Sequence, residues 1–179
     1  ALGLAVAEPD PLRIWLEGWE LGSDDGASPW RVRATEGAFA IDLQLVPTKP
    51  VVLQGERGLS RKGSDPGNAS YYYSLPRMAT QGSITLAGEP LPVSGLSWLD
   101  REWGTSALGP GVVGWDWFAL QLEDGRDLML YHLRQIDGEP AAQSAGVLVD
   151  RGGNAVALTV GRESLTVLRT WVMPRTGIE

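Results

Sequence analysis

The chain has 179 residues, of which 43% are apolar, so it can form one domain of ordinary size or one domain and part of another. Its formal net charge of −7 makes a nucleic-acid backbone or an anionic membrane surface an unsuitable partner. The absence of Cys excludes a disulfide framework, and a single His excludes the usual zinc sites. No apolar run reaches the roughly 20 residues of a transmembrane helix.

The first residues contain apolar segments broken by turn signals. Residues 1–11 are apolar and end in a pair of closely spaced prolines. They lack the basic region of a signal peptide, so we interpret them as an ordinary segment of a longer protein. In the strand that follows, Gly18 marks a bulge or bend. Asp24-Asp25-Gly26 has the composition of a turn rather than of a calcium loop.

Short alternating segments separated by Gly and Pro continue to the end of the chain, and no helix longer than two turns is expected. Asp124-Gly125 joins two alternating arms and gives the clearest hairpin. Residues 54–69 are polar and rich in Gly, and form either a binding loop or a simple connector. In chain order, the predicted strands span residues 12–21, 30–35, 39–46, 51–53, 70–75, 81–86, 91–99, 115–122, 127–134, 146–150, 155–161 and 165–173.

This pattern predicts an all-β fold of antiparallel strands, either a barrel or a sandwich. The many Trp and Tyr residues on alternating faces favour a barrel with an aromatic interior that is wide enough for one apolar ligand.

Charged residues are interleaved with large aromatic ones in residues 93–134. Because side chains alternate along a strand, Trp98, Asp100 and Glu102 share one face, and Leu99, Arg101 and Trp103 share the other. By the same rule, Trp115 and Trp117 face away from Asp116 and Phe118. Unpaired charges are costly to bury, so these groups are expected to be paired or to line a wet pocket.

Each of these features has two interpretations. Asp100, Arg101 and Glu102 form either a catalytic cluster or an ion-pair network with the loop at 54–69. Asp116 is either an acid in an apolar pocket or the partner of Arg101, Arg77 or a Tyr hydroxyl. His132 is either an acid–base group or structural. The Tyr71–Tyr73 run and the Trp residues form either a cavity wall or ordinary core. No Gly-x-Ser-x-Gly motif and no Ser/His/Asp arrangement supplies a hydrolase nucleophile.

Several segments together resemble the AttH family. They are LQGERGLSRKG (53–63), NASYYYSLPRMATQGSITL (68–86), VSGLSWLDREWGTS (93–106) and GWDWFALQLEDGRDLMLYHLR (114–134). This family is lipocalin-like, is related to the carotenoid 1,2-hydratase (CrtC) group and is described as secreted hydrolases. The resemblance implies part of a first lipocalin-like barrel at 1–140 and the first strands of a second one at 141–179. It also implies a secreted or periplasmic location, and association with the rest of a longer protein or with another copy.

The resemblance also implies a chemistry without metal or organic cofactor, in which water adds across a carbon–carbon double bond. The hydratases resemble one another in a His-x-Trp, matched here by Arg101 and Trp103, and in a Tyr-x-Asp, matched here by Tyr131 and Leu133. Arg does not exchange protons near neutral pH, so both departures argue against carotenoid hydration by this chain.

Three functions are therefore considered. The first is binding of an apolar or amphipathic small molecule in an aromatic-lined cavity. The second is a cofactor-independent hydratase, lyase or isomerase that acts on a polyene-like substrate, and the third is a structural barrel without a ligand. The candidate catalytic residues are Asp100, Glu102, Asp116 and His132, and the candidate ligand-binding residues are Tyr71, Tyr73, Arg101, Trp103, Trp115, Trp117 and Tyr131. No metal ligand is expected.

Overall fold

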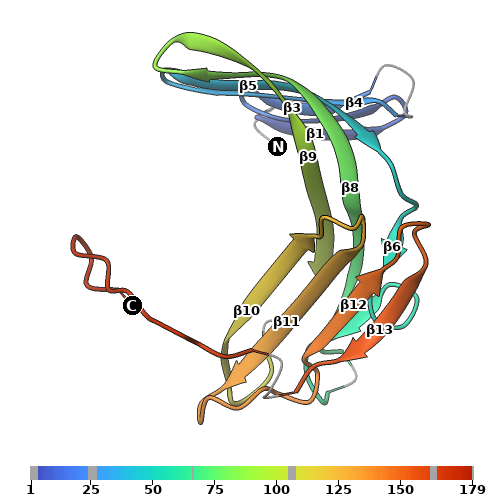
Figure 1. Cartoon of the computed structure of the whole chain (residues 1–179), viewed down its shortest axis with the longest axis vertical. Coiled ribbons are helices and arrows are strands. Elements are labelled where there is room, and N and C mark those ends of the chain that lie inside the picture. The colour runs from blue at the N-terminus through green and yellow to red at the C-terminus, as the bar shows by residue number, and fades with distance from the viewer. Residues whose placement is uncertain (1–3, 24–27, 66, 105–107, 162–164, 179) are drawn as a thin grey trace.

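The computed structural model describes residues 4–23, 28–65, 67–104, 108–161 and 165–178. These residues form thirteen strands and no helix, and all pairings are antiparallel (Figure 1). The predicted all-β, antiparallel class is confirmed. Backbone pairing does not join the two sheets within the described ranges, so the barrel is open there. The predicted turn at Asp24-Asp25-Gly26 lies outside the described residues.

The first sheet contains nine strands in the order β1-β2-β3-β4-β5-β8-β6, with β7 and β9 also paired to β8. Its strands are β1 (Ala5–Pro9), β2 (Leu12–Leu16), β3 (Trp19–Gly22), β4 (Trp30–Glu36), β5 (Phe39–Pro47), β6 (Val52–Leu53), β7 (Leu59–Arg61), β8 (Ala69–Leu86) and β9 (Glu89–Gly104). The second sheet has the order β10-β11-β12-β13, with β10 (Val112–Gln121), β11 (Asp127–Gln135), β12 (Ala145–Val149) and β13 (Ala155–Thr159).

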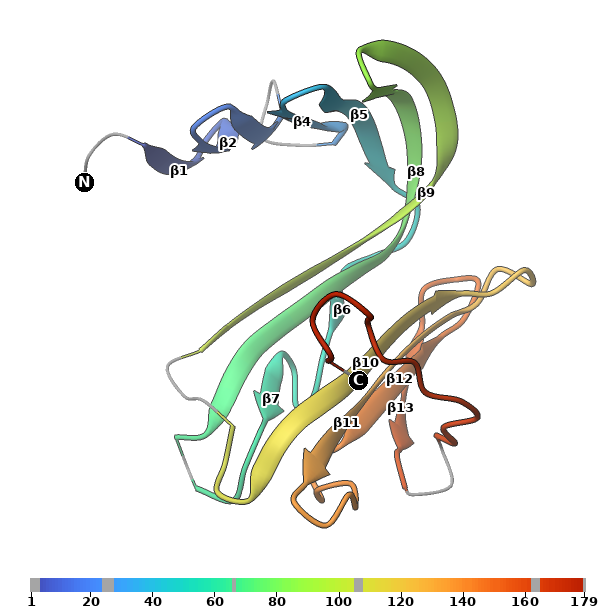
Figure 2. The ribbon, with the colours of Figure 1, turned by 90° about the vertical axis from the view of Figure 1, so that its left-hand side faces the viewer.

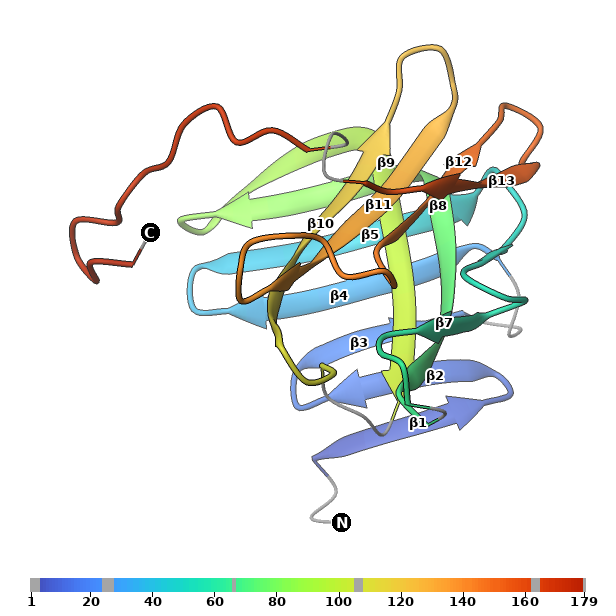
Figure 3. The same ribbon diagram turned by 90° about the horizontal axis from the view of Figure 1, so that it is seen from below.

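The long hairpin β8–β9 runs through the whole molecule and bends near its middle (Figures 1 and 2). The register shifts between Leu75 and Met78, where two residues of β8 oppose one residue of β9. A bulge of this kind bends a strand. The upper part of the hairpin therefore continues the sheet of β1–β5, whereas the lower part faces the second sheet. Seen from below, the strands of the second sheet run across the direction of β4 and β5 (Figure 3).

The main core lies between the lower part of β8–β9 and the second sheet. Val52 and Tyr72 from the first sheet pack against residues of β11 and β12, among them Met129, Tyr131 and Val149. A smaller cluster contains Leu45 and the two residues that flank the bulge, Leu75 and Met78. Because the larger cluster draws on both sheets, its packing determines how closely they approach each other.

Several predicted elements differ from the observed ones. Residues 12–21 form the hairpin β2–β3 rather than one strand, with the turn at Glu17, which has a φ of +53°. The segments 70–75 and 81–86 belong to the single strand β8. Residues 5–9 and 59–61 form strands that were not predicted. The last predicted strand, 165–173, is wrong: these residues pair with no neighbour, and an alternating segment becomes a strand only when another strand supplies hydrogen bonds.

The predicted division of the chain near residue 140 stays a prediction. The strands on either side of it, β11 and β12, pair with each other from Asp127↔Val149 to Tyr131↔Ala145. The described residues contain no helix that is long and apolar enough to cross a membrane. Association with another chain and a location outside the cytoplasm also stay predictions.

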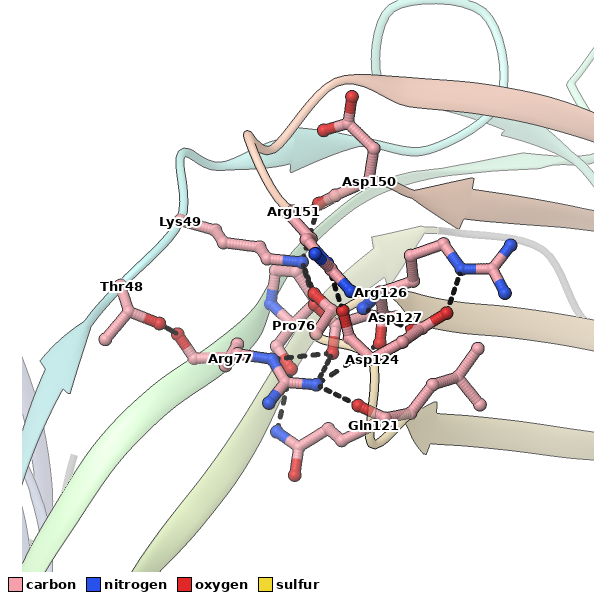
Figure 4. A network of polar contacts seen from close by, with 12 residues as sticks. Thr48, Lys49, Pro76, Arg77, Gln121, Asp124, Arg126, Asp127, Asp150 and Arg151 are labelled. Atoms are coloured by element: carbon pink, nitrogen blue, oxygen red, sulfur yellow. Dashed lines mark hydrogen bonds and ion pairs between the residues drawn. The ribbon is translucent and has the colours of Figure 1, made fainter.

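A buried ion cluster joins the two sheets at the bend (Figure 4). The ammonium of Lys49 donates to Asp127 Oδ2 at 2.6 Å and to the carbonyls of Gly125 and Asp150, each at 2.7 Å. Arg77 donates to the other oxygen of Asp127 from Nε at 3.0 Å and from Nη2 at 2.8 Å. Asp127 is completely buried, and all three donors of Lys49 have acceptors. The cluster thus meets the condition under which buried charges are tolerated.

We predict that Lys49→Met destabilises the fold by about 3–5 kcal/mol, because it breaks a buried ion pair and removes the Lys49 donor from Asp127 Oδ2 and from two carbonyls. Urea unfolding followed by Trp fluorescence measures the change. Arg126→Met is the matched control, since the Arg126–Asp124 pair is exposed and lies next to the cluster in sequence. An exposed pair contributes about 0–1 kcal/mol. Equal effects of the two variants would contradict the role of the buried cluster.

Candidate functional site

A cavity of about 310 Å³ lies between the lower part of β8–β9 and the strands β10 and β11. Five of its eleven lining residues are aromatic, and its polar side chains Lys62, Ser70 and Glu102 contact one another. The residues that line it are Lys62, Ser70, Tyr72, Glu102, Trp103, Gly104, Leu108, Trp115, Trp117, Tyr131 and Leu133. An apolar cavity with a few convergent polar groups is the usual form of a small-molecule site.

A larger hollow of about 1090 Å³ lies over β2–β5 and the upper part of β8–β9. Its charged residues are already paired with each other, Arg13 with Glu20 at 3.1 Å and Arg31 with Asp42 at 2.6 Å, and these side chains are 37–55% exposed. The Arg31 guanidinium lowers the pKa of Asp42 by donating hydrogen bonds to its carboxylate. Solvated ion pairs on an open sheet face are ordinary surface features, so we assign the candidate site to the smaller cavity.

Lys62 and Glu102 form the polar end of this cavity. Lys62 Nζ lies 2.7 Å from Glu102 Oε1, and the Ser70 hydroxyl donates to the same oxygen. The ammonium also lies over the ring of Tyr131, 4.4 Å from its centroid, and 5.4 Å from that of Tyr72. The Lys62 side chain is 16% exposed, so its charge is stabilised by one carboxylate and two aromatic faces instead of bulk water.

Tyr72 forms part of the aromatic wall and brings a hydroxyl to it. Trp117 Nε1 donates to this hydroxyl at 3.2 Å, and the residue is 3% exposed. Burial raises the pKa of Tyr72 well above its ordinary value of 10.0, and the nearby Asp100 carboxylate raises it further. The phenol therefore stays protonated under physiological conditions.

Asp100 pairs with Ser74 on the inner face and does not line the cavity. Its Oδ1 accepts hydrogen bonds from the Ser74 hydroxyl and from Trp98 Nε1, the latter at 2.9 Å. Gln54 Nε2 donates to Ser74 at 2.9 Å, and both residues are buried. This chain of donors holds the Asp100 carboxylate in one position.

The structure brings together part of the predicted set. Trp98, Asp100 and Glu102 share the inner face of β9, as their alternation predicted. Trp103, Trp115, Trp117 and Tyr131 border the cavity together with Glu102.

The remaining candidates do not line this cavity. The rings of Tyr71 and Tyr73 pack against Trp103 with centroid distances of 5.8 and 6.1 Å, on the outer face of β8–β9, where Arg101 is exposed opposite Tyr73. Asp116 pairs with Arg134 at 3.4 Å rather than with Arg101 or Arg77. His132 is buried and its Nε2 lies 3.0 Å from the Gly161 carbonyl. The functional roles of all these residues stay predictions.

The sequence analysis included Tyr72 only within the Tyr71–Tyr73 run and Lys62 only within the loop at 54–69, and it did not name Ser70. Period-two alternation gives the signal for two of them, because Tyr72 and Ser70 must share one face when Tyr71 and Tyr73 take the other. Lys62 follows the unpredicted strand β7, so nothing in the sequence indicated its direction. Within the described ranges, no cluster of three or more His, Cys, Asp or Glu side chains has the arrangement of a metal site.

A sequence model described as AttH-like matches residues 1–179. The chain belongs to the AttH-like family. The resemblance seen in the Tyr run and in the Asp-Arg-Glu-Trp-Gly motif is thus confirmed. A crystal structure of an AttH protein from Nitrosomonas europaea superposes with a TM-score of 0.82 at 35% identity, over 92% of this chain and 51% of that one.

Two curated relatives carry names of water-adding or water-removing enzymes. Dehydratase asqC of Emericella nidulans is 27% identical over 128 residues, which are 70% of this chain and 35% of that protein. Kievitone hydratase of Fusarium solani subsp. phaseoli is 29% identical over 104 residues, which are 56% of this chain and 28% of that protein. A kievitone hydratase structure from Nectria haematococca has a TM-score of 0.64 at 20% identity, over 83% of this chain and 46% of that one, and shows the shared fold. This AttH-like chain spans about a third of each curated relative.

The burial of Tyr72 leads to a prediction about the stability of the folded chain at alkaline pH. An unfolded Tyr ionises near its ordinary pKa of 10.0, whereas the folded residue resists ionisation because its pKa is raised. The stability that this raised pKa contributes is therefore fully present below the unfolded pKa of 10.0, and it is lost as the pH rises through the higher pKa of the folded state. We expect Tyr72→Phe to lose less stability than the parent chain between neutral and strongly alkaline pH, as measured by urea unfolding. Equal losses of stability in the parent chain and in Tyr72→Phe would show that ionisation of Tyr72 does not cause the alkaline loss.

Proposed function

We propose that this chain carries a cofactor-independent site that adds or removes water at a carbon–carbon bond of an apolar substrate. The observation that carries the proposal is the Lys62–Glu102 pair at the end of an aromatic cavity. The names of the two curated relatives, a dehydratase and a hydratase, support this class of reaction.

Water addition requires a group that gives a proton to carbon, a group that accepts a proton from water, and a wall that keeps bulk water out. Glu102 lies in the cavity; in its protonated form it gives the proton to carbon in hydration, and as the carboxylate paired with Lys62 it removes the proton in dehydration. The Lys62 ammonium and the Ser70 hydroxyl hold the carboxylate in place. Trp115 and Trp117 form the apolar wall against which an unsaturated substrate packs.

The experiment offers kievitone, the compound in the name of one relative, to the purified chain and follows a mass gain of one water by liquid chromatography and mass spectrometry. Glu102→Gln keeps the shape of the side chain but cannot transfer the proton, and should lower kcat by about 10²–10⁴-fold. Glu89→Gln is the matched control, because Glu89 is exposed at the other end of the same strand. Full activity of Glu102→Gln would exclude Glu102 as the acid–base group.

Binding of an apolar or amphipathic molecule without turnover is the second candidate function. It is favoured by the exposure of Trp115 and Trp117, which are 59% and 45% exposed at the edge of the cavity. Exposed aromatic surface of this extent at a cavity is a common mark of a binding site.

We predict that Trp117→Ala weakens kievitone binding about tenfold, whereas Trp117→Phe retains most of it, because an aromatic contact contributes about 0.5–1.5 kcal/mol. Quenching of Trp fluorescence by the ligand measures both affinities. Binding to the parent chain that is unaffected by Trp117→Ala would place the ligand elsewhere, and binding without any mass gain would favour this second function over the first.

A further inference from the structure

We propose that the hydroxyl of Tyr72 and the carboxylate of Asp100 act as one proton relay, in which Asp100 is the base and Tyr72 connects it to the cavity. This inference rests on the proposed water chemistry and assigns its second acid–base group. Glu102 supplies the proton to carbon, so a different group must take the proton from the attacking water.

One oxygen of Asp100 has an unusual environment. Oδ1 accepts two hydrogen bonds, from Ser74 and from Trp98, whereas Oδ2 is buried and has no hydrogen-bond partner in the described part of the chain. A buried carboxylate oxygen without a donor is costly, and such groups in native proteins call for a functional or chemical reason. The lone pairs of Oδ2 are therefore free to receive a proton.

Tyr72 is the neighbour of Asp100 on the inner face, because Tyr72 pairs with Glu102 while Asp100 pairs with Ser74, the next inward residue of β8. Its hydroxyl oxygen accepts a hydrogen bond from Trp117 Nε1, so its own hydrogen is available for another acceptor. The Asp100 carboxylate is close enough to act electrostatically on this hydroxyl. Since Tyr72 lines the cavity and Asp100 does not, a proton from the cavity reaches Asp100 through Tyr72.

The relay conserves protons and charge. As the oxygen of water bonds to the substrate carbon, one O–H bond of water breaks and its proton bonds to the Tyr72 oxygen. The original Tyr72 proton moves to Asp100 Oδ2, while Glu102 protonates the neighbouring carbon. Tyr72 ends as a neutral phenol, Asp100 becomes protonated, and Glu102 becomes a carboxylate. Solvent then takes the proton from Asp100 by the same path and reprotonates Glu102.

The surroundings of Tyr72 favour a concerted transfer over a free phenolate. The charged or titratable groups near it are Asp100 and Glu102 from β9, Lys62 after β7, and Tyr131 from β11. Burial and the carboxylates raise the pKa of Tyr72, so the phenolate is disfavoured. Two carboxylates in different environments, one that lines the cavity and one that does not, thus take opposite roles, a pattern known from other acid–base enzymes.

The test combines kinetics with kievitone and a spectroscopic titration. Tyr72→Phe and Asp100→Asn should each lower kcat by about 10²-fold or more with little change in KM, and the double variant should be no slower than either one. Both should also remove the same limb of the pH profile. The relay would be overturned if the kcat loss of the double variant equalled the product of the two single losses. It would also be overturned if Asp100→Asn left kcat unchanged while Glu102→Gln abolished activity. Either result would leave the proposed function intact.

Alkaline absorbance titration gives a readout that needs no turnover. Subtracting the Tyr72→Phe spectrum isolates the ionisation of Tyr72, and Asp100→Asn should move this ionisation to lower pH because the neighbouring negative charge is gone. An identical Tyr72 ionisation with and without Asp100→Asn would overturn the relay. Absence of any water addition by the parent chain would overturn the relay and the proposed function together.

Discussion

The contact between Lys49, Asp127 and Arg77 determines how the two sheets of this protein face each other. Lys49 follows β5, Arg77 lies at the bulge of β8, and Asp127 begins β11, so three separate segments meet at one completely buried carboxylate. Gln121 adds two hydrogen bonds from β10, to the carbonyls of Pro76 at 2.9 Å and Ser97 at 3.0 Å. Apolar packing alone would allow the sheets to slide past each other, whereas these directional hydrogen bonds form in only one relative position of the sheets.

The cavity depends on this arrangement because its walls come from both sheets. Tyr72 and Glu102 belong to β8 and β9, whereas Trp117 and Tyr131 belong to β10 and β11. The hydrogen bond from Trp117 to Tyr72 and the position of Lys62 over Tyr131 connect the two walls. Lys62 thus contacts the first sheet through its ion pair with Glu102 and the second sheet through the ring of Tyr131.

Alternation along strands made the antiparallel class and the inner face of β9 predictable from the sequence. The β8 strand shows where local signals fail. A proline normally ends a strand because it has no N–H to donate. Pro76 instead lies at a bulge, where no hydrogen bond from that position is required. The turn at Glu17 uses a residue with no strong turn preference, so the hairpin β2–β3 looked like one strand. Alternation puts Asp116 and His132 on the faces opposite Trp117 and Tyr131, but only the structure shows which of these faces borders the cavity.

The three consecutive tyrosines of β8 have a consequence for how the chain finds its alignment during folding. A shift by one residue would replace Tyr72 with another tyrosine on the inner face, so the aromatic surface by itself scarcely distinguishes correct from incorrect pairing. The flanking serines do distinguish it. In the shifted arrangement, Ser70 and Ser74 would turn outward, and the carboxylates of Glu102 and Asp100 would lose their hydroxyl partners. Two of the smallest side chains in the strand therefore encode the alignment that its largest ones leave ambiguous.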